Sequence, residues 1–139
     1  MNKILIPINT MHDAEPAVEF VLSEAANDPE VECHLLHVQP PVPIGLSAYM
    51  DRKEIEALEA MQAERTLQPV CEALNVAYIP CIMTFGAGSL DQVLADYAKK
   101  HQCNSIVMGS GRKGILGAIL DKVIAKKVYR LTRIPVRLV

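Results

Sequence analysis

The sequence has no apolar segment long enough to cross a membrane. A transmembrane helix needs about 20 consecutive apolar residues, whereas the first apolar run, Ile4–Ile8, is short and leads into a polar turn. The same run is also too short to be the apolar part of a secretory signal peptide. We therefore expect a cytoplasmic protein with no membrane partner.

Metal and redox motifs are missing too. The four cysteines are widely spaced and no two of them form a CxxC pair, so we interpret them as small buried hydrophobic residues. His34 and His37 lie three apart on a predicted strand and point to opposite faces, which prevents them from sharing one ion. We expect no structural metal, and we expect His37 to be a hydrogen-bonding residue at the end of its strand.

Acidic residues are scarce at the C-terminal end. From Gly109 to Val139 there are eight basic residues and one acid, whereas the rest of the chain has six basic residues and fifteen acids. This asymmetry indicates either solvated helix faces or a surface that meets an anion or an acidic partner. We do not expect nucleic-acid binding, because Tyr129 is the only aromatic residue of this basic segment that offers a stacking surface.

The 139 residues fit one domain spanning residues 1–139, and their apolar pattern alternates between the periods of strands and helices. It predicts strands at Lys3–Asn9, Val31–Gln39, Ala77–Phe85, Asn104–Gly109 and Ile134–Val139. It predicts helices that begin near His12 or Asp13, after Asp51 and after Ser89, and a last one at Ile115–Leu131. The Pro/Gly-rich segment 40–48 is predicted to be a loop.

Two prolines qualify this prediction. Pro69 lies inside the long helix after Asp51, so we expect a kink or break near Leu67. Pro80 lies inside the third strand, and proline is better tolerated at the edge of a sheet than at its centre. In the first helix, Leu22 is expected on the inward stripe.

Strands that alternate with helices predict right-handed crossovers and a parallel sheet. We expect an α/β fold, a doubly wound five-stranded parallel sheet in the order 3-2-1-4-5 with helices on both faces. Such sheets bind ligands where the winding reverses, at the carboxyl ends of the strands. Here that crevice lies between segments 7–10 and 108–111.

At this point the sequence resembles a known family. The segments KILIPIN, LLHV, SIVMGSGRKG and IPVRLV, in this order and spacing, resemble the universal stress proteins over nearly the whole chain. The resemblance implies an adenine nucleotide alpha hydrolase-like fold. It also implies one of two kinds of protein, those that hold ATP in the crevice and those that do not.

The resemblance implies a set of candidate nucleotide-binding residues at the ends of strands one, two and four and in the following loop and helix. They are Pro7, Ile8, Asn9, Val38, Met108, Gly109, Ser110, Gly111, Arg112, Lys113, Gly114 and Lys122. The cofactor implied is ATP or AMP.

The sequence departs from the pattern of the nucleotide-binding relatives, which is Gly-x-x-Gly, nine residues, then Gly-Ser/Thr. Gly109 matches the first glycine, but Arg112 occupies the second position and Gly111 stands one place early. If one residue is deleted in the loop, Gly111 takes the second position, and the closing Gly-Ser/Thr then falls on Asp121 and Lys122. These changes add bulk, remove a hydroxyl donor and place a carboxylate near the triphosphate. Asn9 also replaces the aspartate usual in ATP-binding relatives.

Three functions are consistent with these residues. The first is a regulatory or protective binding protein of the stress response, dimeric, with a degenerate nucleotide crevice. The alternative is an ATP- or AMP-binding universal stress protein with slow ATPase activity. A third is a small-anion binder that uses Arg112 and Lys113. No catalytic residue is predicted, since Ser110 lacks the Gly-x-Ser-x-Gly context of a nucleophile.

The last predicted strand indicates a partner. It is apolar, terminal and at the sheet edge, which favours pairing with another strand. Relatives typically pair this strand antiparallel with its twofold mate, an isologous contact. The resemblance therefore implies a homodimer built around Val136, Leu138 and Val139.

Overall fold

The computed structural model describes residues 1–9, 11–39, 45, 48–109 and 115–139, and for residues 11–13, 115 and 116 it describes the backbone alone. Within these residues the strands are β1 (Asn2–Pro7), β2 (Val31–Gln39), β3 (Cys81–Ala87), β4 (Ser105–Met108) and β5 (Val136–Leu138). The helices are α1 (Met11–Asn27), α3 (Arg52–Val76), α4 (Leu90–Lys100) and α5 (Ile115–Thr132). No helix among the described residues has the length and apolar character needed to span a membrane.

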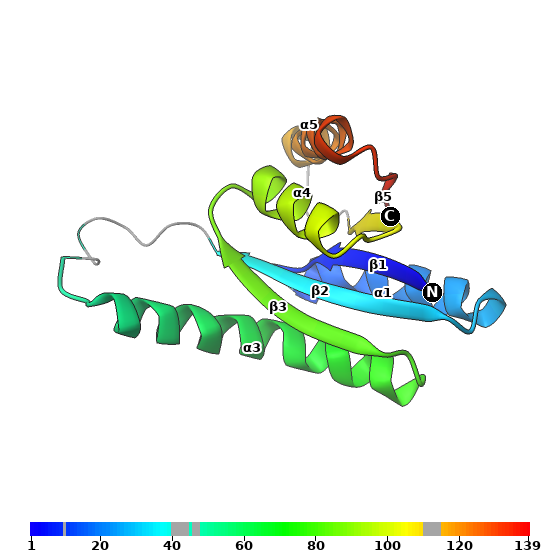
Figure 1. The fold of residues 1–139 in the computed structure, drawn as a ribbon, viewed down its shortest axis with the longest axis horizontal. Coiled ribbons are helices and arrows are strands. Elements are labelled where there is room, and N and C mark those ends of the chain that lie inside the picture. Colours follow the sequence, from blue (N-terminus) through cyan, green and yellow to red (C-terminus); the bar gives the residue numbers. More distant parts are fainter. Residues whose placement is uncertain (10, 40–44, 46–47, 110–114) are drawn as a thin grey trace.

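The strands form one sheet in the order β3-β2-β1-β4-β5, and all four neighbouring pairs are parallel. The predicted fold class and strand order are confirmed, and so is the edge position of β3. Figure 1 shows α1 and α3 on one face of the sheet and α4 and α5 on the other. The molecule therefore has two apolar layers, one on each side of the sheet.

The central strand β1 contributes to both layers. Ile4 and Ile6 pack on the α1 and α3 side, whereas Leu5 packs on the α4 and α5 side. All three are at most 1% exposed, and a continuous apolar run is typical of a strand that is buried on both faces. On the α4 side, Leu94 of α4 and Val128 of α5 complete the second layer.

Two helix predictions are corrected by the structure. The long helix does not break: α3 continues through Pro69. The backbone carbonyl that loses its partner to Pro69 belongs to Arg65, and both residues are exposed, so water can bind that carbonyl. In α1, Leu22 is 40% exposed because the inward stripe consists of Ala14, Ala17 and Val21. The cap at Asp51 is confirmed, since its carboxylate accepts a hydrogen bond from the Glu54 amide.

The cysteines lie as predicted for buried apolar residues, with one exception. Cys33, Cys71 and Cys103 are buried and Cys81 is half-buried, and all four are free thiols. Burial is the main reason why the pKa of Cys33 is raised to about 12, and it also raises the pKa of Cys81 and Cys103. These thiols are therefore protonated and weakly nucleophilic at neutral pH.

We expect slow reaction of the native protein with a thiol reagent at neutral pH. A rise in pKa of about three units leaves Cys33 with a thiolate fraction on the order of 1000-fold smaller than that of a free cysteine. Cys81 is half-buried, but its pKa is raised as well, so easier access does not make it a fast-reacting thiol. Absorbance after mixing with a disulfide reagent measures the rate, and unfolded protein is the control. Rapid labelling of Cys33 in the native protein would contradict the prediction.

Candidate functional site

The crevice predicted at the reversal of the winding lies where β1, β2 and β4 end. β1 pairs with β2 on one side and with β4 on the other, so their carboxyl ends share one edge of the sheet. Four of the predicted site residues, Pro7, Ile8, Val38 and Met108, are buried at this edge. The same residue types would be buried in any protein of this fold, so their burial does not by itself indicate a ligand.

Two predicted residues extend beyond these strand ends. Asn9 is exposed just after β1, and Gly109 is half-buried just after β4. The amide of Asn9 carries both a donor and an acceptor, so it can recognise the edge of a base. A backbone bond from the Val139 amide to the Met108 carbonyl (2.9 Å) joins the end of the chain to the same edge.

A buried chain of hydrogen bonds lies beside the crevice. His37 Nδ1 is 3.0 Å from the Ile8 carbonyl oxygen, and His37 Nε2 is 3.2 Å from Gln39 Nε2. Because a carbonyl accepts, Nδ1 carries the proton and Nε2 accepts from Gln39, which also donates to Gln62 of α3. The prediction for His37 is confirmed. Gln39 and Gln62 were not predicted as partners of His37. The sequence offers a signal for Gln39 alone, because it is a polar residue at the end of an otherwise apolar strand.

A second polar cluster lies at the start of β2 and is separate from the crevice. The Tyr97 hydroxyl is 2.7 Å from His34 Nδ1, and the rings of Tyr97 and His101 stack at 4.1 Å. His34 is 3% exposed, and burial is the main reason why its pKa is lowered. Nearby Lys3 and His101 act in the same direction, whereas Glu32, 3.7 Å from His34 Nε2, opposes them.

We expect His34 to make the protein less stable in mild acid. The unfolded state binds a proton at the ordinary pKa of 6.5, whereas the folded state resists protonation. The contribution is therefore complete above 6.5 and is lost as the pH falls toward the lowered pKa. Urea unfolding of the wild type and His34→Gln at about pH 7.5 and pH 5.5 measures this loss. Equal losses in both proteins would show that His34 does not cause it.

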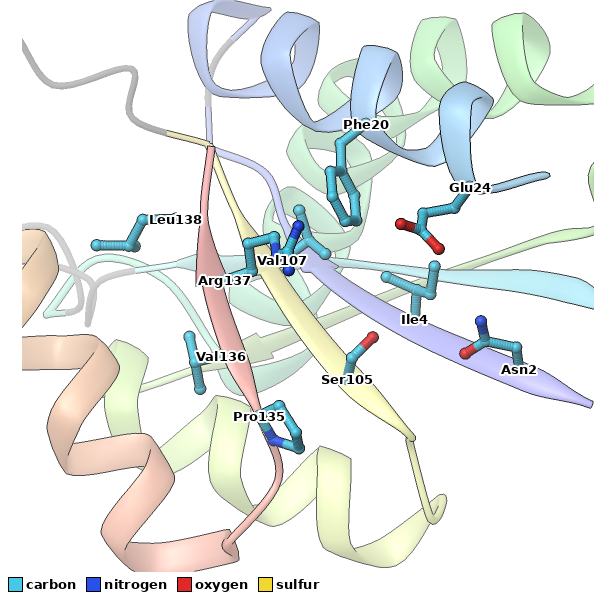
Figure 2. Close-up of a pocket in the computed structure, with 10 residues that line it drawn as sticks. All are labelled: Asn2, Ile4, Phe20, Glu24, Ser105, Val107, Pro135, Val136, Arg137 and Leu138. Atoms are coloured by element: carbon cyan, nitrogen blue, oxygen red, sulfur yellow. The ribbon is translucent and has the colours of Figure 1, made fainter. Parts of the chain in front are cut away.

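A separate hollow of about 530 Å³ lies on the α1 side of the sheet (Figure 2). Ile4 and Val107 form part of its floor, and Phe20 and Glu24 of α1 stand over it. The Arg137 guanidinium lies 5.1 Å from the centre of the Phe20 ring. Among the described residues that line it there is no candidate nucleotide-binding residue, but Val136 and Leu138 of the predicted dimer contact are included.

Comparison with known proteins identifies the family. A family model described as the universal stress protein family matches residues 1–139. The chain belongs to the universal stress protein family. None of the curated proteins matches the sequence significantly.

Solved universal stress proteins share this fold at low sequence identity. A family protein from Arabidopsis thaliana with AMP bound is 13% identical, with a TM-score of 0.69 over 100% of this chain and 91% of that chain. One from Burkholderia pseudomallei is 16% identical, with a TM-score of 0.71 over 99% and 95% of the two chains. One from Archaeoglobus fulgidus in complex with dAMP is 16% identical, with a TM-score of 0.65 over 99% and 97%. The adenine nucleotide alpha hydrolase-like architecture implied by the resemblance is therefore confirmed.

The glycine-rich segment of the universal stress protein pattern lies mostly outside the described residues. This applies to Ser110, Gly111, Arg112, Lys113 and Gly114. Their candidate role therefore stays a prediction.

Helix α5 follows this segment and contains Asp121 and Lys122, the two residues that depart from the closing Gly-Ser/Thr of the pattern when Gly111 is taken as its second glycine. Asp121 is 5% exposed and shares an inward stripe with Ile124 and Val128, whereas Lys122 is exposed. Asp121 is therefore a buried carboxylate, and its match to the closing glycine of the family pattern stays a prediction. The lysine that was predicted to help bind phosphate lies on the outer face of α5, so its role also stays a prediction.

Proposed function

We propose that the protein is a stress-response binding protein that holds an adenine nucleotide in the crevice between β1 and β4. The observation that carries the proposal is the buried apolar strand ends at the reversal of the sheet, Ile8, Val38 and Met108, which lie next to the exposed amide of Asn9. The relatives with AMP and dAMP bound support it. Asn9 would bind the base edge, and the backbone at Gly109 would approach the phosphate.

The preferred ligand in this proposal is a monophosphate. Asp121 is buried two turns into α5, and the alignment with Gly111 as the second glycine places it where the family pattern has its closing glycine. Like charges a few ångströms apart repel by about 1–4 kcal/mol at effective dielectric constants between those of water and a protein surface. AMP keeps its single phosphate near Gly109, whereas the β- and γ-phosphates of ATP would extend toward this carboxylate. We therefore infer tighter binding of AMP than of ATP.

Binding rather than catalysis follows from the same positions. Hydrolysis of ATP needs ordered donors around the terminal phosphates, and the two residues that supply the closing Gly-Ser/Thr in nucleotide-binding relatives are here Asp121 and Lys122. The proposal also places this single domain, residues 1–139, in the cytoplasm. It makes the protein a homodimer that pairs β5 antiparallel around Val136, Leu138 and Val139.

Calorimetric titration with AMP and with ATP and magnesium tests the nucleotide proposal. The protein is first unfolded and refolded, and its absorbance confirms that no nucleotide remains. We expect micromolar binding of AMP that is lost in Gly109→Val, whose unfolding temperature shows whether it still folds, and weakened in Asn9→Ala. Absence of heat with either nucleotide, together with no co-purified nucleotide, would refute it. Steady phosphate release from ATP would support the ATPase alternative.

A further inference from the structure

β3 is an edge strand, so among the described residues no strand pairs with its outer side, although the Cys81 carbonyl accepts a hydrogen bond from Cys71 Sγ (3.8 Å). The Cys33 amide donates to the Pro80 carbonyl (2.9 Å), and the Gly88 amide donates to the Gln39 carbonyl (3.1 Å). With the parallel register of β2 and β3, these bonds direct the even-numbered residues of β3 toward β2. The odd-numbered residues therefore direct their N–H and C=O groups outward. These residues are Cys81, Met83, Phe85 and Ala87.

This edge is apolar and carries no charge. Ile82 is 44% exposed, Met83 39% and Phe85 42%, and no charged residue or histidine occurs in the segment 73–90. Proteins normally protect a free edge with charges, prolines, bulges or a very short strand. β3 has seven residues and none of these features between its ends. The other edge, β5, has three residues with Arg137 at their centre.

We propose that β3 pairs antiparallel with β3 of a second copy of the chain, around a twofold axis at Thr84. Such a contact is isologous, so each residue must suit the residue that the symmetry places opposite it. With the axis at Thr84, Met83 lies opposite Phe85 of the second copy, and both use their outward N–H and C=O groups. The whole length of β3 is then paired. The proposal concerns the opposite edge from β5 and does not depend on nucleotide binding.

The side chains on the α3 face are complementary in this register. Met83 and Phe85 border a groove of about 210 Å³ whose other wall is formed by residues of α3, namely Ala60, Ala63, Glu64 and Leu67. The second copy adds its own Met83 and Phe85 over the same groove. Each methionine sulfur then meets an aromatic ring, which is a favourable contact.

The opposite face of β3 is also complementary. There Ile82 lies opposite Gly86 of the second copy, so a large side chain faces a residue that has none. Thr84 lies opposite itself, and threonine pairs across antiparallel strands are stabilising. Segment 73–90 contains no charged residue, so the two paired strands do not repel each other, and Glu64 of α3 is the charged residue that borders the contact. This self-complementarity favours a second copy over an extended segment of another protein.

Sedimentation velocity of the full chain, from about 1 to 100 micromolar, tests the contact. Met83→Pro removes one outward N–H and places the ring at the free edge, without removing a bond to β2. Met83→Leu is the matched control, because it retains the N–H and a similar volume. We expect Met83→Pro to reduce the mass of the largest species about twofold, and Met83→Leu to behave like the wild type.

Two further variants keep the result interpretable. Phe85→Lys should weaken the same contact without proline, and Leu138→Lys disrupts the β5 contact of the proposed homodimer. If both edges pair, each edge variant reduces the assembly and the double variant Met83→Pro/Leu138→Lys is monomeric. If only Leu138→Lys has an effect, the β3 contact is overturned. If only Met83→Pro and Phe85→Lys have an effect, β3 is the interface and the β5 homodimer fails. A wild-type monomer at the highest concentration overturns both.

Discussion

Gly86→Val is expected to lower the free energy of unfolding by about 3 kcal/mol, at the upper end of the usual cost of overpacking. A Cβ atom at Gly86 would lie 2.8 Å from Val93 Cγ1, closer than real Cβ contacts. Val93 is β-branched and therefore has little rotamer freedom in α4. It lies one residue before Leu94, which is fully buried, so α4 cannot move away without opening the second apolar layer.

Urea unfolding measures this effect, and a double-mutant cycle assigns its cause. In a Val93→Ala background the contact atom is missing, so Gly86→Ala should cost much less there than in the wild type. Ala87→Val, at an exposed position of the same strand, controls for adding a β-branched side chain to β3. An equal cost of Gly86→Ala in both backgrounds would show that close packing against Val93 is not the reason for this glycine.

The fold was predictable because its signals are local and repeated. The bounds of β2 were predicted residue for residue as Val31–Gln39, and the strand order followed from the alternation of strands and helices. Pro80 correctly indicated that β3 is an edge strand, but the predicted bounds Ala77–Phe85 were wrong, because the strand begins after Pro80, at Cys81. Tyr78 adopts a positive φ of 61° in the turn between α3 and β3. Nothing in residue preference predicts a tyrosine in that conformation.

Solvent exposure decided the helix predictions that failed. Pro69 is compatible with α3 because its face of the helix meets water, and sequence periodicity alone does not show which face a proline occupies. The buried stripe of α1 is narrow and consists of Ala14, Ala17 and Val21. Leu22 directly follows Val21, so it points about 100° away from this stripe and is exposed. Both outcomes depend on how much of each helix the sheet covers.

The strand ends at the candidate site could be predicted from the sequence, whereas most of the buried hydrogen bonds beside them could not. The strand ends and His37 followed from the fold, since the carboxyl ends of parallel strands meet at one edge. The partners Gln39 and Gln62 are brought together by tertiary packing, from residues 23 apart in the sequence. For Asp121 a signal was available, because it shares helical spacing with Ile124 and Val128. That spacing places the carboxylate inward and Lys122 outward.

Asp121→Asn is expected to tighten ATP binding by about fivefold or more, because in the proposed mode of binding it removes about 1–4 kcal/mol of repulsion between the carboxylate and the terminal phosphates. AMP affinity should change little, since its single phosphate stays near Gly109. The ratio of the two affinities is therefore the quantity to measure, by titration of both nucleotides into both proteins. This ratio cancels any general loss of stability that follows from altering a buried side chain.

Lys122→Ser provides the matched control at the neighbouring position. Lys122 is exposed on the outer face of α5, so its replacement should leave the ratio of AMP to ATP affinity nearly unchanged, although it restores the hydroxyl of the family pattern. A larger change in the ratio for Lys122→Ser than for Asp121→Asn would mean that the side chain of residue 122 reaches the phosphates. The discrimination between nucleotides would then depend on a lost hydroxyl donor. If Asp121→Asn alone changes the ratio, the buried carboxylate is what adapts this crevice to a monophosphate.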